Sequence, residues 1–504
     1  MEAIFAGIVA VFTLQTILLI IAGVVIGIVF GAIPGMSAAM AIALCLPISF
    51  GLGPVEGLSL LLGLYIGGIS GGLISAILLK MPGTPSSIAT VFDGYPMAQN
   101  GEAGKALGVG IVYSFLGGLF SILCLIFISP SIAKIAVKFS PYEYFAVGIF
   151  ALTLISSLAE GSIVKGLISG LFGVSIALVG SAPIDSYKRF TFGIHDFDAG
   201  FSMLAVLIGV YAISEIISAS GNKAKIQSKD IMKFKMKGFG FTLKEFFGQK
   251  WNLLRSSLIG TGIGILPGMG GGTSNILSYV AAKGQSKYPE KFGTGIIDGI
   301  VASESANNAS IGGAMIPLLT LGIPGDAVTA ILLGGFMIHG ITPGPMLFRT
   351  NTELVYSIFA ALVVANIVMI VVLFFGIRQF VKLLQVPRNI LLSVILVLCV
   401  VGAIANNNRI FDAYAMVAFG LIGYGLSKIK FPIPPVILGF ILAPLIETNL
   451  RRGLMLSNGS MTPFITKPIS AVFLLAAALS IIYSFYKEYM KAKNLKLKIN
   501  NISS

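Results

Sequence analysis

Long apolar runs separated by short polar stretches make up almost the whole chain. The predominantly apolar runs at 106–128, 353–375 and 469–486 are each long enough to cross about 30 Å of hydrocarbon as an α-helix. The run at 3–30 is too long for the core of a signal peptide and no basic segment precedes it, so we expect it to be retained as a membrane span. The pattern predicts an all-α polytopic membrane protein with about 10–12 membrane segments.

Four Pro-Gly pairs break these apolar runs in two matched sets. Pro34-Gly35 and Pro267-Gly268 are each followed by methionine, in the stretches GAIPGMSAAM and GILPGMGGGT. Pro82-Gly83 and Pro324-Gly325 come later in each half, and a glycine pair precedes each of them. The landmarks recur in the same order at nearly equal spacing, which indicates an internal duplication. The competing interpretation is that Pro and Gly are simply common in membrane helices.

Basic residues divide the chain and predict its orientation. Eight lysines lie in the segment 223–250 and five more lie in the tail, and such clusters beside membrane spans mark the cytoplasmic side. No Lys or Arg precedes Lys80, so we expect the N-terminus outside. The two halves would then enter from opposite sides, as two inverted repeats with Pro-Gly-broken helices or re-entrant hairpins. The predicted division is a first membrane repeat at 1–222, a basic cytoplasmic linker at 223–250, a second repeat with C-terminal spans at 251–486, and a basic cytoplasmic tail at 487–504.

The composition agrees with this class of protein and excludes others. Of 504 residues, 56% are hydrophobic and only 11% are charged, which is far too apolar for a soluble globular chain. The net charge of +14 is concentrated in the basic clusters. We interpret it as a topology signal, with contact to anionic membrane lipid as the alternative, and expect no nucleic-acid partner. The three cysteines have no metal-ligand spacing, so we expect no structural metal. The sequence contains no P-loop, so we expect no ATP hydrolysis by this chain. We predict that the chain is not an enzyme and has no cofactor.

Broken membrane helices can build a binding site. Irregular backbone at membrane depth persists only where protein buries it or where it lines a wet cavity. A break exposes amides at the start of the next half-helix, which suit a carboxylate, and carbonyls, which suit Na⁺. Hydroxyl and amide side chains beside the breaks can add hydrogen bonds. The predicted substrate-binding residues are Pro34, Gly35, Ser37, Gly83, Thr84, Ser86, Gly268, Thr273, Ser274, Asn275, Asn307, Asn308 and Gly325.

Two acids in apolar surroundings are candidates for ion coupling, because an ionisable residue inside a membrane is a functional candidate by default. We expect Glu304 and Asp326 to coordinate a cation, since they would repel an anionic substrate, and we add Thr329 to this set. The alternative for each acid is a salt bridge or a solvated loop at the rim of the membrane.

Two long strings resemble the signatures of a known family. They are KMPGTPSSIATVFDGYPMAQNGEAGKALG at 80–108 and ASESANNASIGGAMIPLLTLGIPGDAVTAILLGGFMIHGITPGP at 302–345. With the two Pro-Gly-Met motifs, they resemble the large membrane subunit of the tripartite tricarboxylate transporters, the TctA family, from about residue 15 to about residue 430. Carried onto this sequence, the resemblance implies site regions at 34–37, 82–87, 267–275, 304–308 and 324–329.

The resemblance also implies what the chain does and with what it works. It implies a secondary transporter of the bacterial inner membrane that takes up carboxylates and is driven by an ion gradient, usually of Na⁺. It implies two partners, a small membrane subunit and a periplasmic solute-binding protein that delivers the carboxylate. "Tricarboxylate" is a family label here, because members differ widely in substrate.

Other functions remain as alternatives to this interpretation. The chain could be a stand-alone ion-coupled carboxylate transporter, or a channel, although inverted repeats of broken helices favour alternating access over a continuous pore. The stretch GIPGD, which ends at Asp326, loosely resembles the acid motif of intramembrane aspartyl proteases. However, its first glycine position does not match and no Tyr-Asp partner is evident, so the protease is the weakest alternative.

Overall fold

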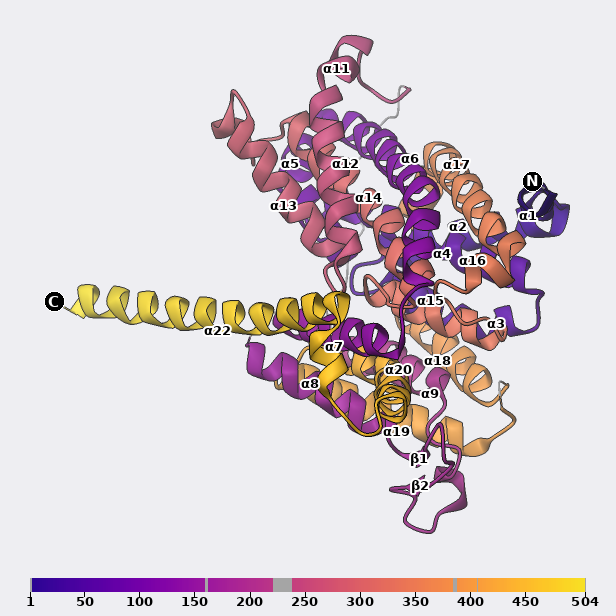
Figure 1. The fold of residues 1–504 in the computed structure, drawn as a ribbon. Helices are drawn as coiled ribbons and strands as arrows, with labels where there is room; N and C mark the ends of the chain where they lie inside the picture. The colour runs from indigo at the N-terminus through magenta and orange to yellow at the C-terminus, as the bar shows by residue number, and fades with distance from the viewer. Residues whose placement is uncertain (1, 159–161, 221–237, 384–387, 406, 504) are drawn as a thin grey trace. The chain divides into compact units, whose positions relative to one another are not determined.

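The computed structural model describes residues 2–158, 162–220, 238–383, 388–405 and 407–503 (Figure 1). Most of the predicted linker, at 223–237, lies outside the described residues. The predicted role of its lysines in topology therefore stays a prediction. The described part is almost entirely α-helical. Its only strands are the two-residue pair β1 (Gly180–Ser181) and β2 (Lys188–Arg189), which are antiparallel. The prediction of an all-α protein is confirmed.

Seven helical segments of the described chain are long and apolar enough to cross a membrane, which confirms a polytopic membrane protein. They are α2 (Leu14–Ala32), α4 (Pro54–Leu79), the segment Pro85–Ala136 that holds α5 (Ile88–Met97) and α6 (Ala103–Ala136), α17 (Thr352–Leu383), α19 (Ile410–Lys428), α20 (Ile433–Leu456) and α22 (Pro468–Ser503). Shorter apolar helices include α1 (Glu2–Val11), α3 (Ala38–Phe50), α8 (Ile163–Ala177) and α15 (Ala327–Ile338). The number of complete crossings depends on these shorter helices, so the predicted 10–12 segments stay a prediction.

The chain forms two compact units. One comprises Met1–Ala136 and Leu207–Leu421, and the other comprises Val137–Val206 and Ile422–Ser504. In the second unit, α7 (Pro141–Leu158) and α8 pack against α20. There Arg189 binds Glu447 through two hydrogen bonds of 2.7 and 3.1 Å, so the β1–β2 hairpin is tied to α20. All four Pro-Gly breaks lie in the first unit, which therefore contains the candidate site.

Glycines allow the helices of the first unit to pack closely. Gly23 and Gly27 of α2 face α4, where an added Cβ at Gly27 would lie 2.5 Å from the carbonyl oxygen of Leu64. In the second half, α12 (Lys250–Ile265) presents Gly260 and Gly264 to α14 (Ile297–Leu321) in the same way. Small residues let backbones approach closely where lipid supplies no hydrophobic drive for helix association. The small-residue spacing in α4 therefore has a packing role.

Equivalent helices of the two halves run in opposite directions. Ser70 of α4 bonds to Asn308 of α14. Leu73, which comes later in α4, and Glu304, which comes earlier in α14, both lie beside Gly110. Moving forward along α4 therefore means moving backward along α14. On α6 and α17, Asn366 donates to the carbonyl of Phe115, whereas Phe239 contacts both Gly108 and the later residue Phe374.

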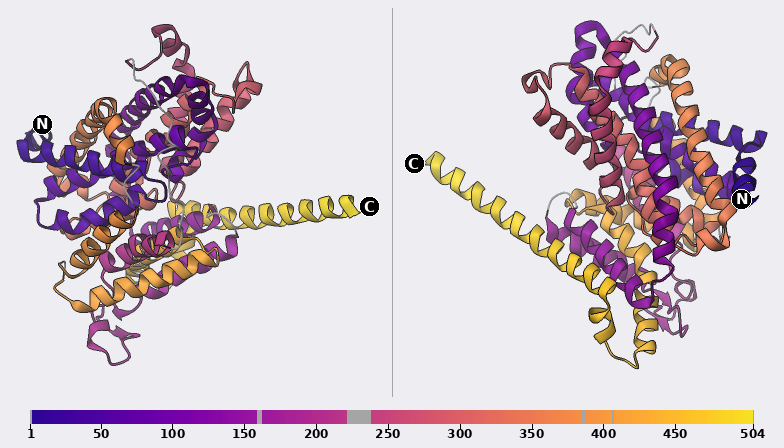
Figure 2. Two further views of the ribbon diagram at one scale, coloured as in Figure 1. Left: turned by 180° about the vertical axis from the view of Figure 1, so that it is seen from behind. Right: turned by 45° about the horizontal axis from the view of Figure 1, so that its top comes forward.

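The packing partners are exchanged in the same manner between the halves. Helix α6 of the first half packs along α14 of the second, and α17 packs along α4. Figure 2 shows the same ribbon from two further directions. This antiparallel arrangement of equivalent helices supports the proposed inverted duplication.

Candidate functional site

The first and third breaks have the same backbone conformation. Between α2 and α3, Gly35 has φ 82°, and between α12 and α13 (Gly270–Gln285), Gly268 also has φ 82°. This left-handed region is open to glycine and costly for residues with a Cβ. The matched angles explain why each Pro-Gly-Met motif contains glycine at this position.

The second and fourth breaks depend on close backbone approach. Gly83 packs on the carbonyl of Gly31, at the end of α2, and Gly325 packs on the carbonyl of Gly264, at the end of α12. An added Cβ at Gly325 would lie 2.6 Å from the Gly264 oxygen, closer than real Cβ contacts allow. Neither Gly83 nor Gly325 has a positive φ, so contact with the neighbouring helix end explains these glycines.

Side chains cap the helices that follow two of the four breaks. Ser37 caps α3 by accepting a 3.2 Å hydrogen bond from the amide of Met40. Asp326 caps α15, where it accepts hydrogen bonds of 2.7 Å from the amide and from the hydroxyl of Thr329. The other carboxylate oxygen of Asp326 accepts a 2.7 Å bond from Tyr65. These bonds leave Asp326 in a helix-capping role and facing a tyrosine, which gives the aspartyl protease alternative no support.

The other two helix starts face each other. Helix α13 begins with Gly270, Gly271 and Gly272, and its N-cap Met269 provides no side-chain hydrogen bond. Opposite lies the segment after the second break, where Ser86 accepts a hydrogen bond from Asn275 through its carbonyl oxygen. An added Cβ at Gly271 would lie 2.7 Å from the Ser86 hydroxyl and 2.8 Å from the Asn307 side-chain oxygen. One helix start from each half and one residue of α14 therefore meet at Gly271, and of the two starts that of α13 has no side-chain cap.

Polar groups without partners surround this meeting point. The Asn307 side chain is wholly buried, and neither its oxygen nor its nitrogen has a hydrogen-bond partner in the described part of the chain. The same holds for the Thr84 hydroxyl and for the side-chain oxygen of Asn275. Buried polar groups are normally hydrogen-bonded, because an unpaired one costs free energy. A polar ligand between α13 and the Thr84–Ser87 turn would satisfy them.

Glu304 lies one turn before Asn307 on α14 and has hydrogen-bond donors of its own. Its carboxylate is wholly buried and accepts hydrogen bonds from Thr90, at 2.5 Å, and from Ser114, at 2.7 Å. No Lys, Arg or His pairs with it within the described residues. Asn308 bonds to Ser70 of α4 at 2.6 Å and so helps to hold α14 against the first half.

The structure brings together some of the predicted residues and separates others. Around Gly271 of α13 lie Ser86, Asn275 and Asn307. Just before α13, the Gly268 amide donates a 2.8 Å bond to the Gly325 carbonyl, so these two residues belong to the same region. Thr273 and Ser274 continue α13 from this set, and the Ser274 hydroxyl bonds to the Ala306 carbonyl at 3.2 Å. Pro34, Gly35 and Ser37 form the turn before α3, where the side chain of Ser37 serves as a cap.

Sequence reasoning missed four polar residues of this interior. They are Tyr65, Thr90, Asp93 and Ser114, each fully buried. Asp93 accepts a 2.8 Å bond from Tyr279 and three bonds from backbone amides of the loop before α14, those of Gly293, Gly295 and Ile296. The rule that singled out Glu304 also applies to Asp93, because it is an acid within an apolar segment. Tyr65, Thr90 and Ser114 have no comparable signal in the sequence.

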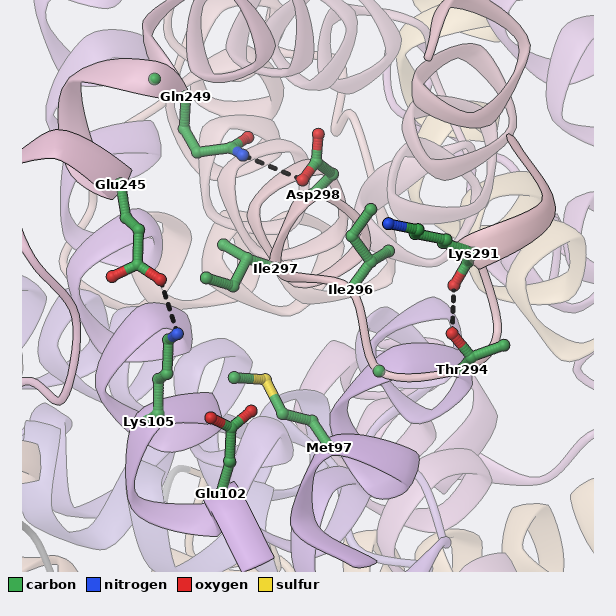
Figure 3. A pocket seen from close by; sticks show the side chains of 12 residues that line it. Met97, Glu102, Lys105, Glu245, Gln249, Lys291, Thr294, Ile296, Ile297 and Asp298 are labelled. Atoms are coloured by element: carbon green, nitrogen blue, oxygen red, sulfur yellow. Dashed lines mark hydrogen bonds and ion pairs between the residues drawn. The ribbon is translucent and has the colours of Figure 1, made fainter. Parts of the chain in front are cut away.

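A pocket of about 450 Å³ lies where α5 ends and where α6 and α14 begin (Figure 3). On one side Lys105 of α6 forms a 2.6 Å ion pair with Glu245 of α11 (Leu243–Gly248), and the Lys105 ammonium lowers the pKa of Glu245 to about 2. On another side Gln249 donates a 3.0 Å bond to Asp298 at the start of α14. The loop that binds Asp93 forms a third wall. Within the described residues, no group of three or more His, Cys, Asp or Glu could hold a metal ion.

The fold and the site define an α-helical membrane transport protein whose discontinuous helices meet in its interior. The chain belongs to the Tripartite tricarboxylate transporter TctA family, whose pattern it matches over residues 17–438. TctA is a family of transporters, whose members are large membrane subunits of a tripartite system. The family resemblance found in the sequence is confirmed.

Two relatives come from Agrobacterium vitis. An uncharacterized 52.8 kDa protein in the TAR-I ttuC' 3'region is 36% identical over 429 residues, which is 85% of each chain. An uncharacterized protein in the TAR-II ttuC' 3'region is 39% identical over 215 residues, which is 43% of this chain and 89% of the relative. No solved structure matches the chain.

Proposed function

We propose that this chain is the large transmembrane subunit of a binding-protein-dependent secondary transporter that takes up carboxylates. The substrate is a tricarboxylate or a related organic anion. Membership of the TctA family supports transport, and the paired helix breaks support a ligand site inside the first unit. The chain would work in a bacterial inner membrane, in contact with lipid, with a small membrane subunit and a periplasmic solute-binding protein.

One observation carries the carboxylate class. The α13 start has three successive glycines, no side-chain cap, and the unpartnered Asn307 amide beside it. Free amides at a helix N-terminus bind anions through hydrogen bonds and through the positive end of the helix dipole. The glycines let a ligand approach the backbone, and Ser86 and Asn307 supply further donors. No Lys or Arg is needed, so a carboxylate can bind without a buried ion pair.

Na⁺ is the proposed coupling ion. Glu304, Asp326 and Thr329 remain candidates for this role, and the absence of a cationic partner for Glu304 within the described chain supports an ion-dependent state there. Asp326 is a weaker candidate as the structure stands, because Tyr65 and Thr329 already occupy both of its oxygens. To coordinate Na⁺, Asp326 would have to release its bond to Tyr65 or its bonds to Thr329.

Uptake in vesicles tests this proposal. The chain and its small partner would be reconstituted, and labelled citrate and succinate would be offered with and without the binding protein and a Na⁺ gradient. Accumulation above the outside concentration that requires both the binding protein and Na⁺ is expected. Accumulation without the binding protein would favour a stand-alone transporter. Equilibration without accumulation would indicate a channel.

A further inference from the structure

Three helices connect the candidate binding site with the pocket of Figure 3. Helix α5 runs from the turn at Ser86 to Met97, which lines the pocket. Helix α14 carries Asn307 at the site and begins at Ile297, which also lines the pocket. Helix α13 runs away from the site towards the loop that forms the third wall. The site and the pocket therefore lie at the two ends of α5, α13 and α14, and we call the packed interior between these helices the passage.

Side chains from all three helices close this passage. A buried apolar cluster fills it between the two ends and comprises Ala89, Tyr279, Ala282, Phe292 and Ala302. The rings of Tyr279 and Phe292 lie edge to face, with centroids 5.4 Å apart. On the pocket side of this cluster, the Tyr279 hydroxyl donates to Asp93 at 2.8 Å. Asp93 also binds the amides of Gly295 and Ile296, two residues that line the pocket wall.

The helix that carries Asp93 is short, and irregular backbone lies on both sides of it. Helix α5 has ten residues, and the Pro82-Gly83 break precedes it. Beyond its other end Gly101 has φ 87° in an irregular turn, with nothing within 4 Å of an added Cβ. The loop that holds Asp93 has Gly293 at φ 93° and Gly295 at φ 106°. Irregular backbone on both sides of a short helix is where hinge motions concentrate.

The equivalent position in the other half has no such bond. By the spacing of the second and fourth breaks, Gly335 of α15 corresponds to Asp93 of α5. There α15 packs on α3 and α4, and an added Cβ at Gly335 would meet the Leu61 and Leu46 side chains at 2.6 and 3.6 Å. Apolar contact replaces the acid and its donors, so the polar closure belongs to the α5–α13 end alone.

We infer that Asp93 and Tyr279 form a gate between the binding site and the pocket of Figure 3, and that the carboxylate ligand passes between α5 and α13 when their hydrogen bond breaks. The inference rests on the proposed transport function. The pocket is the vestibule of this route, and the structure shows the gate closed. Because Glu245 and Gln249 place the pocket beside the predicted cytoplasmic linker, this is the inner gate if the linker is cytoplasmic.

Cysteine accessibility tests the gate without reference to any substrate. In the full chain with Cys45, Cys124 and Cys399 replaced by alanine, Ser86→Cys reports the site end of the passage. A water-soluble maleimide would be added to membrane vesicles from the linker side. Tyr279→Phe keeps the ring and removes only the hydroxyl. We expect it to raise the labelling rate about tenfold or more, the factor that one hydrogen bond to a charged group represents.

Two further variants make the result specific. Gly299→Ala would place a Cβ against Asp93 and 2.9 Å from the Tyr279 ring, so it should also raise labelling. Tyr113→Phe is the matched control, because Tyr113 donates a 3.1 Å bond to the Phe246 carbonyl outside the passage, and it should leave labelling unchanged. Equal labelling in Tyr279→Phe and its parent, or an equal rise in Tyr113→Phe, would overturn the gate. Citrate uptake is measured separately in the chain with its native Ser86. If that chain takes up no citrate, the transport proposal fails, while labelling of the Ser86→Cys variants still decides whether the gate exists.

Discussion

At the scale of single residues, close backbone contacts and unpartnered polar atoms carry the argument. The glycines at the breaks have two different reasons to be glycine. Gly35 and Gly268 adopt a left-handed φ, whereas Gly83 and Gly325 lie against helix carbonyls. Both pairs follow proline, so the sequence marks the four positions alike, although the physical constraint differs between the pairs. Substitutions should distinguish the two.

Gly325→Ala should abolish transport while the protein still inserts, because its Cβ would displace the Gly264 carbonyl that ends α12. Gly83→Ala should do the same in the first half. Gly262→Ala is the matched control, since nothing lies within 4 Å of an added Cβ there. Uptake would be measured beside the amount of protein in the membrane. Normal uptake by the Gly325 variant would show that this close contact is dispensable.

Asn307→Ala should weaken substrate binding without disturbing the fold, because the Asn307 side chain makes no hydrogen bond to a described residue. The loss of one hydrogen bond to a charged ligand corresponds to about 1.5–3 kcal/mol, or about 10- to 150-fold in affinity. The comparison is Asn366→Ala, which removes a bond to the Phe115 carbonyl and should alter stability rather than affinity. Titration of labelled citrate onto the purified variants checks both. Unchanged affinity in Asn307→Ala would move the site away from α13.

At the scale of elements, the sequence predicts where helices break but not which helices meet. Pro-Gly pairs and glycine spacing predict the ends of α2, α4, α12 and α14, because proline blocks continuation of a helix and glycine permits a turn. The bonds from Tyr65 to Asp326 and from Asn275 to Ser86 join residues far apart in the chain. Such pairs follow from how helices pack across the two halves. No local pattern encodes them, and this is why Tyr65 and Thr90 were missed.

Helix α11 should stay attached to α6 until strongly acidic pH. The ion pair with Lys105 lowers the pKa of Glu245 from 4.5 to about 2. A carboxyl with a lowered pKa contributes stability above its unperturbed pKa and loses it as pH falls through the lowered one. Trp251, the single tryptophan, can report this by fluorescence. We expect little change from pH 7 to about 4.5 and a transition below it. Glu245→Gln should remove that transition, and a transition of the same size in this variant would assign it to another group.

At the scale of the whole molecule, orientation in the membrane is the central prediction. A tag at the N-terminus should be accessible from outside, and tags at Ser228 and at the C-terminus from inside, as the basic clusters predict. Impermeant labelling of intact cells and of inverted vesicles would measure each tag. If the N-terminus and Ser228 were found on the same side, the halves could not enter the membrane from opposite faces. The antiparallel course of α4 and α14 would then need another explanation.

The contact of Gly83 with Gly31 and that of Gly325 with Gly264 also concern ancestry. Both halves keep this contact, whereas the first half has Thr84 where the second has Asp326. Each of these contacts joins residues of the same half, so an ancestor with one half would have contained it in every copy, including both copies of a homodimer of oppositely inserted chains. In that dimer every change at a ligand position would have occurred twice. Two halves joined in one chain are free to differ, and here the acid Asp326 stands in one half and Thr84 in the other, while the glycines of both contacts are the same.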